Sequence, residues 1–497
     1  MAGMSIALNR FGLGTRLEDG PGAEPRAWLE QQLHRYVVAP APLAGQPTSD
    51  ALVAEFAAYR DRISQLRKST PSAPPPPAMN ARPAGAMAPL VPQPPIVQTG
   101  DDPAEALRKQ FGQQSRDLYN GAVTARALAA LQSPAPFAER LVHFWANHFA
   151  VSGDKMEVTN LAGAFEFEAI RPHVMGSFRE MLFAVERHPA MLLFLDQAVS
   201  VGPNSALAMR AANRPNVRRA LGLNENLARE ILELHTLGVR AGYSQADVTE
   251  FARALTGWTI AGFGRGPVAK FIGGTGRQGD FVYADALHEP GARTILGQQW
   301  SQQGEAQAAA VLDHLATHPA TARHIATKLA RHFAGDDPPP KLVAQLEANF
   351  RKTGGDLPSL YRTLIASPEC WAPGTVKFKS PWEWSISAMR AVGTQQLQPN
   401  AVPGLMYQLG QPVWKPGSPA GWDDVAGAWA GPDAVLRRVE AAERMAQRTR
   451  DQIDPRARAA AMFPEALSPA TAQSIARAES NSQGVALLLV APEFLRR

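Results

Sequence analysis

Cysteine is almost absent from this chain, because Cys370 is the only one among 497 residues. A single thiol cannot form a disulfide within the chain, and it excludes a zinc site built from several thiolates. This usage is typical of a reducing compartment and is also compatible with a periplasm. We therefore expect the chain to fold without covalent cross-links.

Long apolar runs and targeting signals are lacking too. Residues 1–10 contain no basic region followed by a sustained apolar stretch, so no signal peptide is predicted. An apolar run such as Val485–Val490 is far shorter than the roughly 18 residues that a membrane-spanning helix needs. We expect a soluble cytoplasmic protein without a transmembrane segment, and a periplasmic location stays open.

Charge of one sign does not cluster anywhere. The 50 Lys and Arg residues outnumber the 45 Asp and Glu residues, but the two kinds are interspersed along the chain. Without a basic run, no nucleic-acid partner is predicted. The His-Glu-x-x-His, Gly-x-Ser-x-Gly and phosphate-loop motifs are also missing, so no standard catalytic class is indicated.

Helical periodicity dominates what the sequence does contain. Apolar residues recur at spacings of three and four outside a Pro- and Ala-rich stretch, 69–104, and a Gly-rich stretch, 261–300. The Pro-rich stretch cannot bury a core, so we expect a long disordered insertion there. In the Gly-rich stretch, 280–283 and 293–296 flank a turn at 288–291, which predicts a β-hairpin.

These patterns predict a mainly α-helical protein, a multi-helix bundle with a small β-hairpin insertion. A chain of this length is expected to build more than one hydrophobic core. The expected parts are an N-terminal helical segment (1–68), the disordered insertion (69–104), a central helical core (105–260), the Gly-rich β-hairpin (261–300) and a C-terminal helical part with Trp-rich loops (301–497).

One predicted helix, 224–237, carries a carboxylate in its apolar stripe. At about 100° per residue, Leu227 and Ile231 lie on one face, Glu230 falls within it, and Glu233 lies at its edge. A carboxylate on a buried face needs a cation, hydrogen bonds or a raised pKa. Glu230 is therefore predicted to be a catalytic or metal-binding residue.

A structural role for Glu230 stays open. It would then form a buried ion pair with an arginine such as Arg126 or Arg171 and shape the bundle without chemistry. Glu233 is either a further metal ligand or a solvated or salt-bridged residue. His235 projects about 140° away from Glu230 by the same angular count, so we do not expect one ion to bind both.

His148 is a second candidate, because it shares the apolar face of its helix. Leu141, Phe144 and Trp145 form that face in the helix predicted at 135–150. One interpretation of His148 is a core imidazole that is hydrogen-bonded to a backbone carbonyl. The other is a metal ligand or general base that faces the helix of Glu230.

The leading functional hypothesis is an enzyme with a buried site made of Glu230 and His148. Glu233 and Asp196, which ends a neighbouring predicted helix, are candidates to complete a divalent-metal site, since carboxylates with imidazole suit Mn, Fe or Zn. His288 lies in the predicted turn and is either simply exposed or part of the site. The choice between a hydrolase and an oxidoreductase stays open.

Tryptophan supports a second hypothesis. Six of the ten Trp residues lie between Trp371 and Trp429, and the loop 410–422 combines Trp414 and Trp422 with several Pro and Gly residues. These rings either pin the loop to the helical core or offer a stacking platform to a ligand. In the second case the chain would be a non-catalytic accessory or scaffold protein that binds a protein or a glycan.

The sequence also resembles a known family. The residues that carry the resemblance are Asn9–Gly14, Phe144–Phe149, His188–Met191, Leu195–Asp196, Asn224–Gly238, Gly242–Ser244, Phe251–Trp258, His288–Gly297 and Gly410–Trp422. On these motifs, which span nearly all of the chain except the Pro-rich insertion, it resembles the bacterial domain-of-unknown-function family 1800. The resemblance implies no activity, and members of that family often carry export signals. Its pattern includes His148, Asp196, Glu230, Glu233, His235 and His288, which implies a site near them.

Overall fold

The computed structural model describes residues 2–17, 24–69, 102–212, 221–263, 272, 276–374, 377–464 and 466–497. The predicted insertion 69–104 lies largely outside these residues, but its ends do not. Helix α3 (Ser49–Ser69) ends at Ser69, and α4 (Pro103–Gln132) begins at Pro103 with the Asp102 carboxylate as its cap. The described chain is mainly α-helical, as predicted.

The helices are joined mostly by short connections. Before the strands they are α1 (Ala2–Ile6), α2 (Pro25–Arg35), α3, α4, α5 (Pro136–His148), α6 (Met156–Phe165), α7 (Phe178–Arg187), α8 (Pro189–Phe194), α9 (Ala206–Ala211), α11 (Asn226–Glu230) and α12 (Gln245–Leu255). After the strands they are α14 (Glu305–Thr317), α15 (Pro319–Ala334), α16 (Pro340–Thr353), α17 (Leu357–Ala366), α18 (Pro381–Ala391), α19 (Ala401–Gln408), α20 (Pro432–Arg448), α21 (Pro455–Met462), α22 (Pro469–Ala476), α23 (Asn481–Leu489) and α24 (Pro492–Leu495). Many start with proline, whose fixed φ and missing N–H suit the first helical position.

The β-structure differs from the predicted hairpin. Strand β2 (Phe281–Tyr283) pairs with β1 (Trp258–Ile260), and β3 (Arg293–Ile295) pairs with β4 (Gln298–Trp300), both antiparallel. Strands β2 and β3 lie where strands were predicted, but β1 and β4 were not predicted, and the predicted pairing of 280–283 with 293–296 is wrong. The reason is the tight turn Leu296–Gly297, where both residues have positive φ (53° and 72°) and fold β3 directly onto β4.

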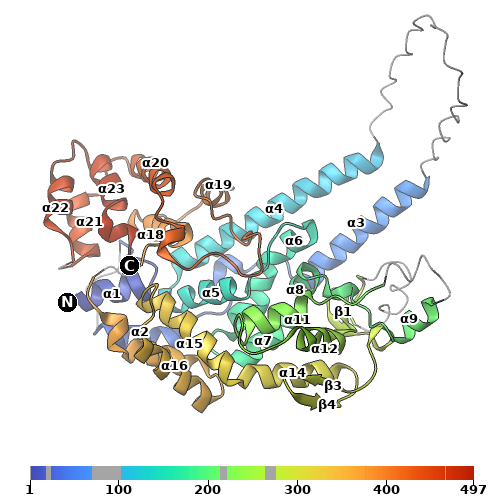
Figure 1. Cartoon of the computed structure of the whole chain (residues 1–497). Coiled ribbons are helices and arrows are strands. Elements are labelled where there is room, and N and C mark those ends of the chain that lie inside the picture. Colours follow the sequence, from blue (N-terminus) through green and yellow to red (C-terminus); the bar gives the residue numbers. More distant parts are fainter. Residues whose placement is uncertain are drawn as a thin grey trace, which may run out of the picture.

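Figure 1 shows how these elements are arranged. The long helices α3 and α4 lie side by side and project from the body of the molecule. Helices α20–α23 gather at one end, around a second hydrophobic cluster that they share with α18 and α24, while β3, β4 and α14 lie at the other end. Helices α5 and α15 lie between these ends and carry the main core.

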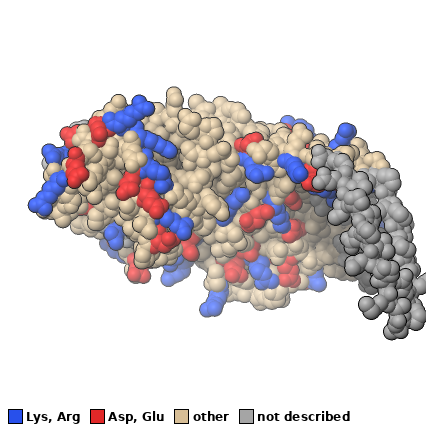
Figure 2. Space-filling model, turned by 90° about the horizontal axis from the view of Figure 1, so that it is seen from above, with Lys and Arg blue, Asp and Glu red and all other residues tan. Residues whose placement is uncertain are grey.

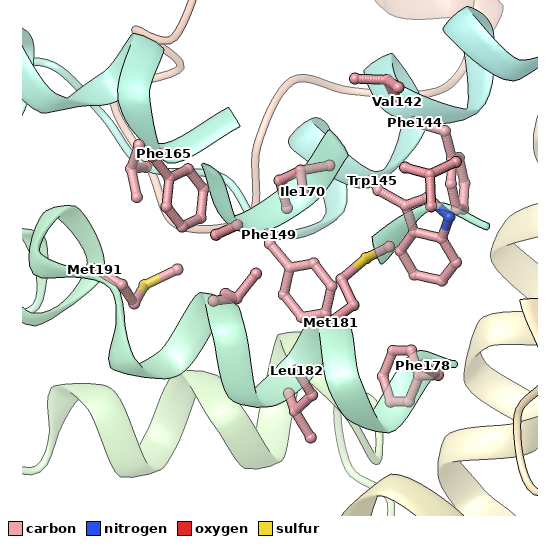
Figure 3. Close-up of a cluster of buried hydrophobic side chains, with 14 of the residues drawn as sticks. Val142, Phe144, Trp145, Phe149, Phe165, Ile170, Phe178, Met181, Leu182 and Met191 are labelled. Carbon is pink, nitrogen blue, oxygen red and sulfur yellow. The ribbon is translucent and has the colours of Figure 1, made fainter. Parts of the chain in front are cut away.

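Aromatic side chains fill the main core where α5 meets α7 (Figure 3). The rings of Trp145 and Phe149 lie 6.0 Å apart, and that of Phe178 lies about 6 Å from each. Ring packing of this kind fixes side-chain rotamers. The C-terminal end of α5, with His148, is therefore held rigidly.

Among the described residues, none of the helices combines the length and the apolar character that a bilayer crossing requires. On the face shown in Figure 2, acidic and basic side chains are interspersed, with broad areas of neither.

Candidate functional site

A cavity of about 250 Å³ lies where α5 meets α15, the start of α18 and the loop 411–429. Of the residues singled out from the sequence, His148, Trp414 and Trp422 belong to its wall. The wall does not include Glu230, Glu233, Asp196 or His288. The structure therefore brings His148 together with the Trp-rich loop rather than with Glu230.

The loop that carries Trp422 is fixed to α5 by Asn147. Nδ2 of Asn147 donates to the Trp422 carbonyl, and Oδ1 accepts from the Trp422 N–H, both at 2.8 Å. Gly421 has φ +77°, and a Cβ there would overlap the carbonyl oxygen of Asn147. Only glycine suits this position, so the local sequence dictates how the loop closes the cavity.

Trp414 is anchored by a buried carboxylate. Its Nε1 donates to Oε2 of Glu166 at 2.9 Å, and Glu166 also accepts from Nε of Arg126 at 2.8 and 2.9 Å. The guanidinium of Arg126 lies 4.2 Å from the ring centre of Trp382. The positive charge of Arg126 is therefore balanced within the protein by an ion pair and an aromatic face.

Glu383, in the first turn of α18, is held by two arginines. Its Oε1 accepts from Nη1 of Arg140 and lies 2.9 Å from Nε of Arg497, while Oε2 accepts from the N–H of Ser380 at 2.9 Å as part of a capping box. Burial alone would raise the pKa of Glu383, but Arg497 and Arg140 outweigh it and hold the pKa well below its usual range. This carboxylate is ionised and fully engaged.

Asp424 is engaged in the same way. Its oxygens lie 2.8 Å from Nζ of Lys377 and 3.2 Å from Nδ1 of His332. Burial alone would raise the pKa of Asp424, but His332 and Lys377 outweigh it and keep the pKa below its ordinary value. Burial, together with Arg497, lowers the pKa of His332 to about 4. Lys377 therefore supplies the positive charge that balances Asp424 at pH 7.

Two cations of the wall, both on α15, have no carboxylate partner. Nζ of Lys328 makes no hydrogen bond or ion pair with any residue that the structure describes. Burial and the nearby charge of Arg331 lower the pKa of Lys328 to about 8, while the charge of Asp424 acts in the opposite direction. Nε of Arg331 donates to the Asp336 carbonyl at 3.3 Å, and its terminal nitrogens pair with none of the described side chains. These guanidinium and ammonium groups are free to bind a ligand.

Two neutral donors of the wall also lack an acceptor. Nδ1 of His143 accepts from Nε1 of Trp382 at 3.1 Å, which places the imidazole hydrogen on Nε2. Burial, with Arg126 nearby, holds the pKa of His143 well below its ordinary value, so the ring is neutral at pH 7. Nε2 of His143 and Nε1 of Trp422 are both buried without a hydrogen-bond partner in the described part of the chain.

His148 offers a hydrogen-bond acceptor, whereas His143 and Trp422 offer donors. Its Nε2 lies 3.1 Å from the carbonyl oxygen of His235, which can only accept, so Nε2 carries the hydrogen and Nδ1 carries the lone pair. Nδ1 is buried and finds no donor among the described residues. Burial, reinforced by Lys328, holds the pKa of His148 well below its ordinary value. Nδ1 of His148 is thus a neutral acceptor in a wall that also holds unpaired donors.

The helix of Glu230 departs from α-geometry halfway along. After α11 the chain continues as a π-helix, Ile231–His235, whose wider turns change the direction of every following side chain. His235, the last residue of this π-helix, has a completely buried side chain. Glu230 is half-buried, and burial raises its pKa.

The arginines proposed as partners of Glu230 are paired elsewhere. Arg126 binds Glu166, and Arg171 binds Glu139. The predicted ion pair of Glu230 is therefore wrong for both arginines. Within the described ranges, no group of three or more His, Cys, Asp or Glu side chains is placed to hold a metal ion.

A buried pair that the sequence analysis missed lies beside this helix. Nδ1 of His235 lies 2.7 Å from Oε1 of Glu186, and both side chains are fully buried. Glu186 shares the apolar stripe of α7 with Leu182, so the criterion that singled out Glu230 would have found it. Glu233 accepts a hydrogen bond from the hydroxyl of Tyr243 at 2.8 Å.

The remaining sequence candidates lie apart from the cavity. Asp196 is half exposed and lies 2.5 Å from Nζ of Lys155, which also binds the carbonyl groups that end α8. His288 is buried, not exposed, and its Nδ1 lies 2.9 Å from the Thr256 carbonyl. Neither of them contributes to the cavity wall.

The polar residues of α15 were not foreseen from the sequence. His324, Lys328 and His332 follow one another at spacings of four, so they form a polar stripe along one side of this amphipathic helix. That spacing was the available signal. The spacing is the same for a polar stripe that faces solvent and for one that faces a cavity.

A family model described as "Protein of unknown function (DUF1800)" matches residues 6–496, nearly the whole chain. No curated protein and no solved structure matches the chain.

Proposed function

The chain belongs to this family of unknown function, and we propose from the cavity that the protein binds a small anionic molecule there. Lys328 and Arg331 are the cations that receive it. The single observation that carries the proposal is the Lys328 ammonium group, which lies in the cavity wall without a carboxylate partner in the described structure. A desolvated cation of this kind is unfavourable until an anion compensates it.

The balance of charge in the wall supports this assignment. The buried carboxylate of Glu383 and the partly buried carboxylate of Asp424 already engage Arg140, Arg497 and Lys377. The charge of Asp424 acts against the burial that lowers the pKa of Lys328, and the exposed Asp423 also belongs to the wall, but neither carboxylate forms an ion pair with Lys328 in the described structure. An incoming anion therefore meets two cations, Lys328 and Arg331, that have no ion-pair partner in the described structure.

Neutral donors support the same conclusion. Nε2 of His143 and Nε1 of Trp422 belong to wall side chains and lack acceptors in the described structure. Leaving a buried donor unsatisfied costs about 1–3 kcal/mol. Carboxylate, sulfate and phosphate oxygens are the acceptors that satisfy such donors and a lysine together.

The burial of the Trp rings favours binding inside the cavity over an outer platform. Trp382, Trp384, Trp414 and Trp429 are buried, and Trp422 is partly buried. Trp422 and Trp429 are inclined at 56° to each other and do not form a flat surface. A ligand in the cavity would therefore meet the rings of Trp382, Trp414, Trp422 and Trp429 as walls, and the volume of about 250 Å³ suits a small molecule.

The proposal is tested by calorimetric titration of the purified protein with sulfate at pH 7. We expect saturable binding that is about tenfold or more weaker in Lys328→Met and in Arg331→Met, since each removes a charged hydrogen bond. Lys352→Met is the matched control, because Lys352 is an exposed lysine on the neighbouring helix α16. Equal affinity in Lys328→Met and the unaltered protein would refute the proposal.

A further inference from the structure

We infer that the anionic ligand also carries a hydroxyl group close to its charged group, and that Nδ1 of His148 accepts a hydrogen bond from it. The ligand class would then be a hydroxy acid or a sugar acid. This inference rests on the proposed anion binding and names the chemistry of the ligand more narrowly.

The surroundings of His148 determine which of its ring nitrogens carries the hydrogen. The carbonyl oxygen of His235, 3.1 Å from Nε2, fixes the hydrogen on that nitrogen. The imidazole is also held in place by neighbouring rings, since its centre lies 4.4 Å from that of Phe149 and 5.4 Å from that of Trp145. The lone pair of Nδ1 therefore has a fixed direction, is buried without a partner in the described structure, and belongs to a residue of the cavity wall.

The ring of His148 is uncharged at pH 7. His148 is buried beside Lys328, and both effects keep the ring neutral at pH 7. A neutral nitrogen with a free lone pair binds a donor, whereas a sulfate or carboxylate oxygen offers only lone pairs and is repelled. The anion therefore satisfies Lys328 and Arg331, but it cannot satisfy His148.

The ligand group that donates to His148 is expected to be a hydroxyl group rather than an ammonium group. An ammonium group on the ligand is disfavoured, because Lys328 and Arg331 belong to the same wall and repel it. A hydroxyl group is neutral, donates one hydrogen bond and also accepts. It can therefore donate to His148 and accept from a free donor such as Nε1 of Trp422.

Matched pairs of carboxylates test the inference. Lactate differs from propionate by one hydroxyl group next to the carboxylate, and glucuronate differs from glucose by its charge. We expect lactate to bind about tenfold more tightly than propionate, and glucuronate to bind where glucose does not. In His148→Phe, the affinity for lactate should fall to that for propionate, while the affinity for propionate stays the same.

The wild-type comparison keeps the test independent of whether His148→Phe folds. A second readout is the ¹⁵N chemical shift of Nδ1 of His148, which should move when lactate binds and stay in place when propionate binds. Equal binding of lactate and propionate by the unaltered protein would overturn this inference and leave anion binding intact. If neither carboxylate nor sulfate binds, the proposed function itself is refuted, and this inference with it.

Discussion

Replacing Lys328 by methionine should stabilise the protein and, at the same time, weaken its binding of anions about tenfold or more. The side chain is half-buried on α15, and its Nζ has no ion-pair partner within the described structure. Methionine has a similar length and no charge. The substitution therefore removes the desolvated ammonium group and retains most of the packing.

The magnitude follows from the pKa of Lys328. A fall from the ordinary 10.5 to about 8 in the folded protein corresponds to about 3 kcal/mol of unfavourable free energy at pH 7, as an upper limit. The unfolded chain binds the proton more tightly, so this penalty is fully present below pH 8. It is relieved as the pH rises from about 8 to 10.5.

Scanning calorimetry at several pH values measures this effect. The unfolding entropy of a chain of 497 residues is about 1 kcal/mol/K, so the expected gain in Tm for Lys328→Met at pH 7 is at most about 3 °C. The gain should shrink above pH 8, and Lys352→Met should show none. Added sulfate should raise the Tm of the unaltered protein but not that of Lys328→Met. A lower Tm for Lys328→Met at pH 7 would refute the reasoning, because Lys328 would then be a satisfied structural cation.

Four further predictions concern the cavity and the helix of Glu230. The sulfate affinity of the unaltered protein should be constant below pH 8 and fall about tenfold per pH unit above it, because only the protonated Lys328 binds an anion; a flat profile in titrations up to pH 10 would contradict this. Gly421→Ala should weaken sulfate binding and lower the Tm, since its Cβ would collide with the α5 backbone; an unchanged Tm would show that the loop does not need glycine. Glu166→Gln should destabilise the protein by about 3–5 kcal/mol, because it leaves Arg126 buried without its counter-ion, and denaturant unfolding measures the change. Glu230→Gln should leave sulfate affinity and metal content unchanged, because Glu230 lies outside the cavity wall; loss of bound metal without unfolding, seen by elemental analysis, would instead support a metal site at Glu230.

The fold was largely predictable, because helices leave a periodic signal in a single sequence. The strands were also found at 280–283 and 293–296, but their pairing was not, since it depends on a turn that places Leu296 at a φ of +53°. A leucine gives no local signal for such a backbone. The actual partners, β1 and β4, follow from tertiary packing around Trp258 and from that turn.

The site was predictable only in part. The angular count placed His148 on a buried face correctly, because α5 is a regular helix as far as that residue. The same count does not apply beyond Glu230, since the chain continues there as a π-helix, which departs from 100° per residue and which nothing in the sequence marks. The cavity joins His148, Lys328 and Trp422, which are far apart in the chain. No periodic pattern links such distant positions, so their meeting could not be foreseen.

The central claim, that an anion binds at Lys328, is tested most directly by diffraction from crystals soaked in selenate, whose selenium atom marks its own position. The account predicts an anomalous peak in the cavity, with selenate oxygens at hydrogen-bonding distance, about 2.7–2.9 Å, from Nζ of Lys328. It also predicts a terminal nitrogen of Arg331 beside the same anion. Selenate bound only at the outer surface, with the cavity free of it at saturating concentration, would contradict the account.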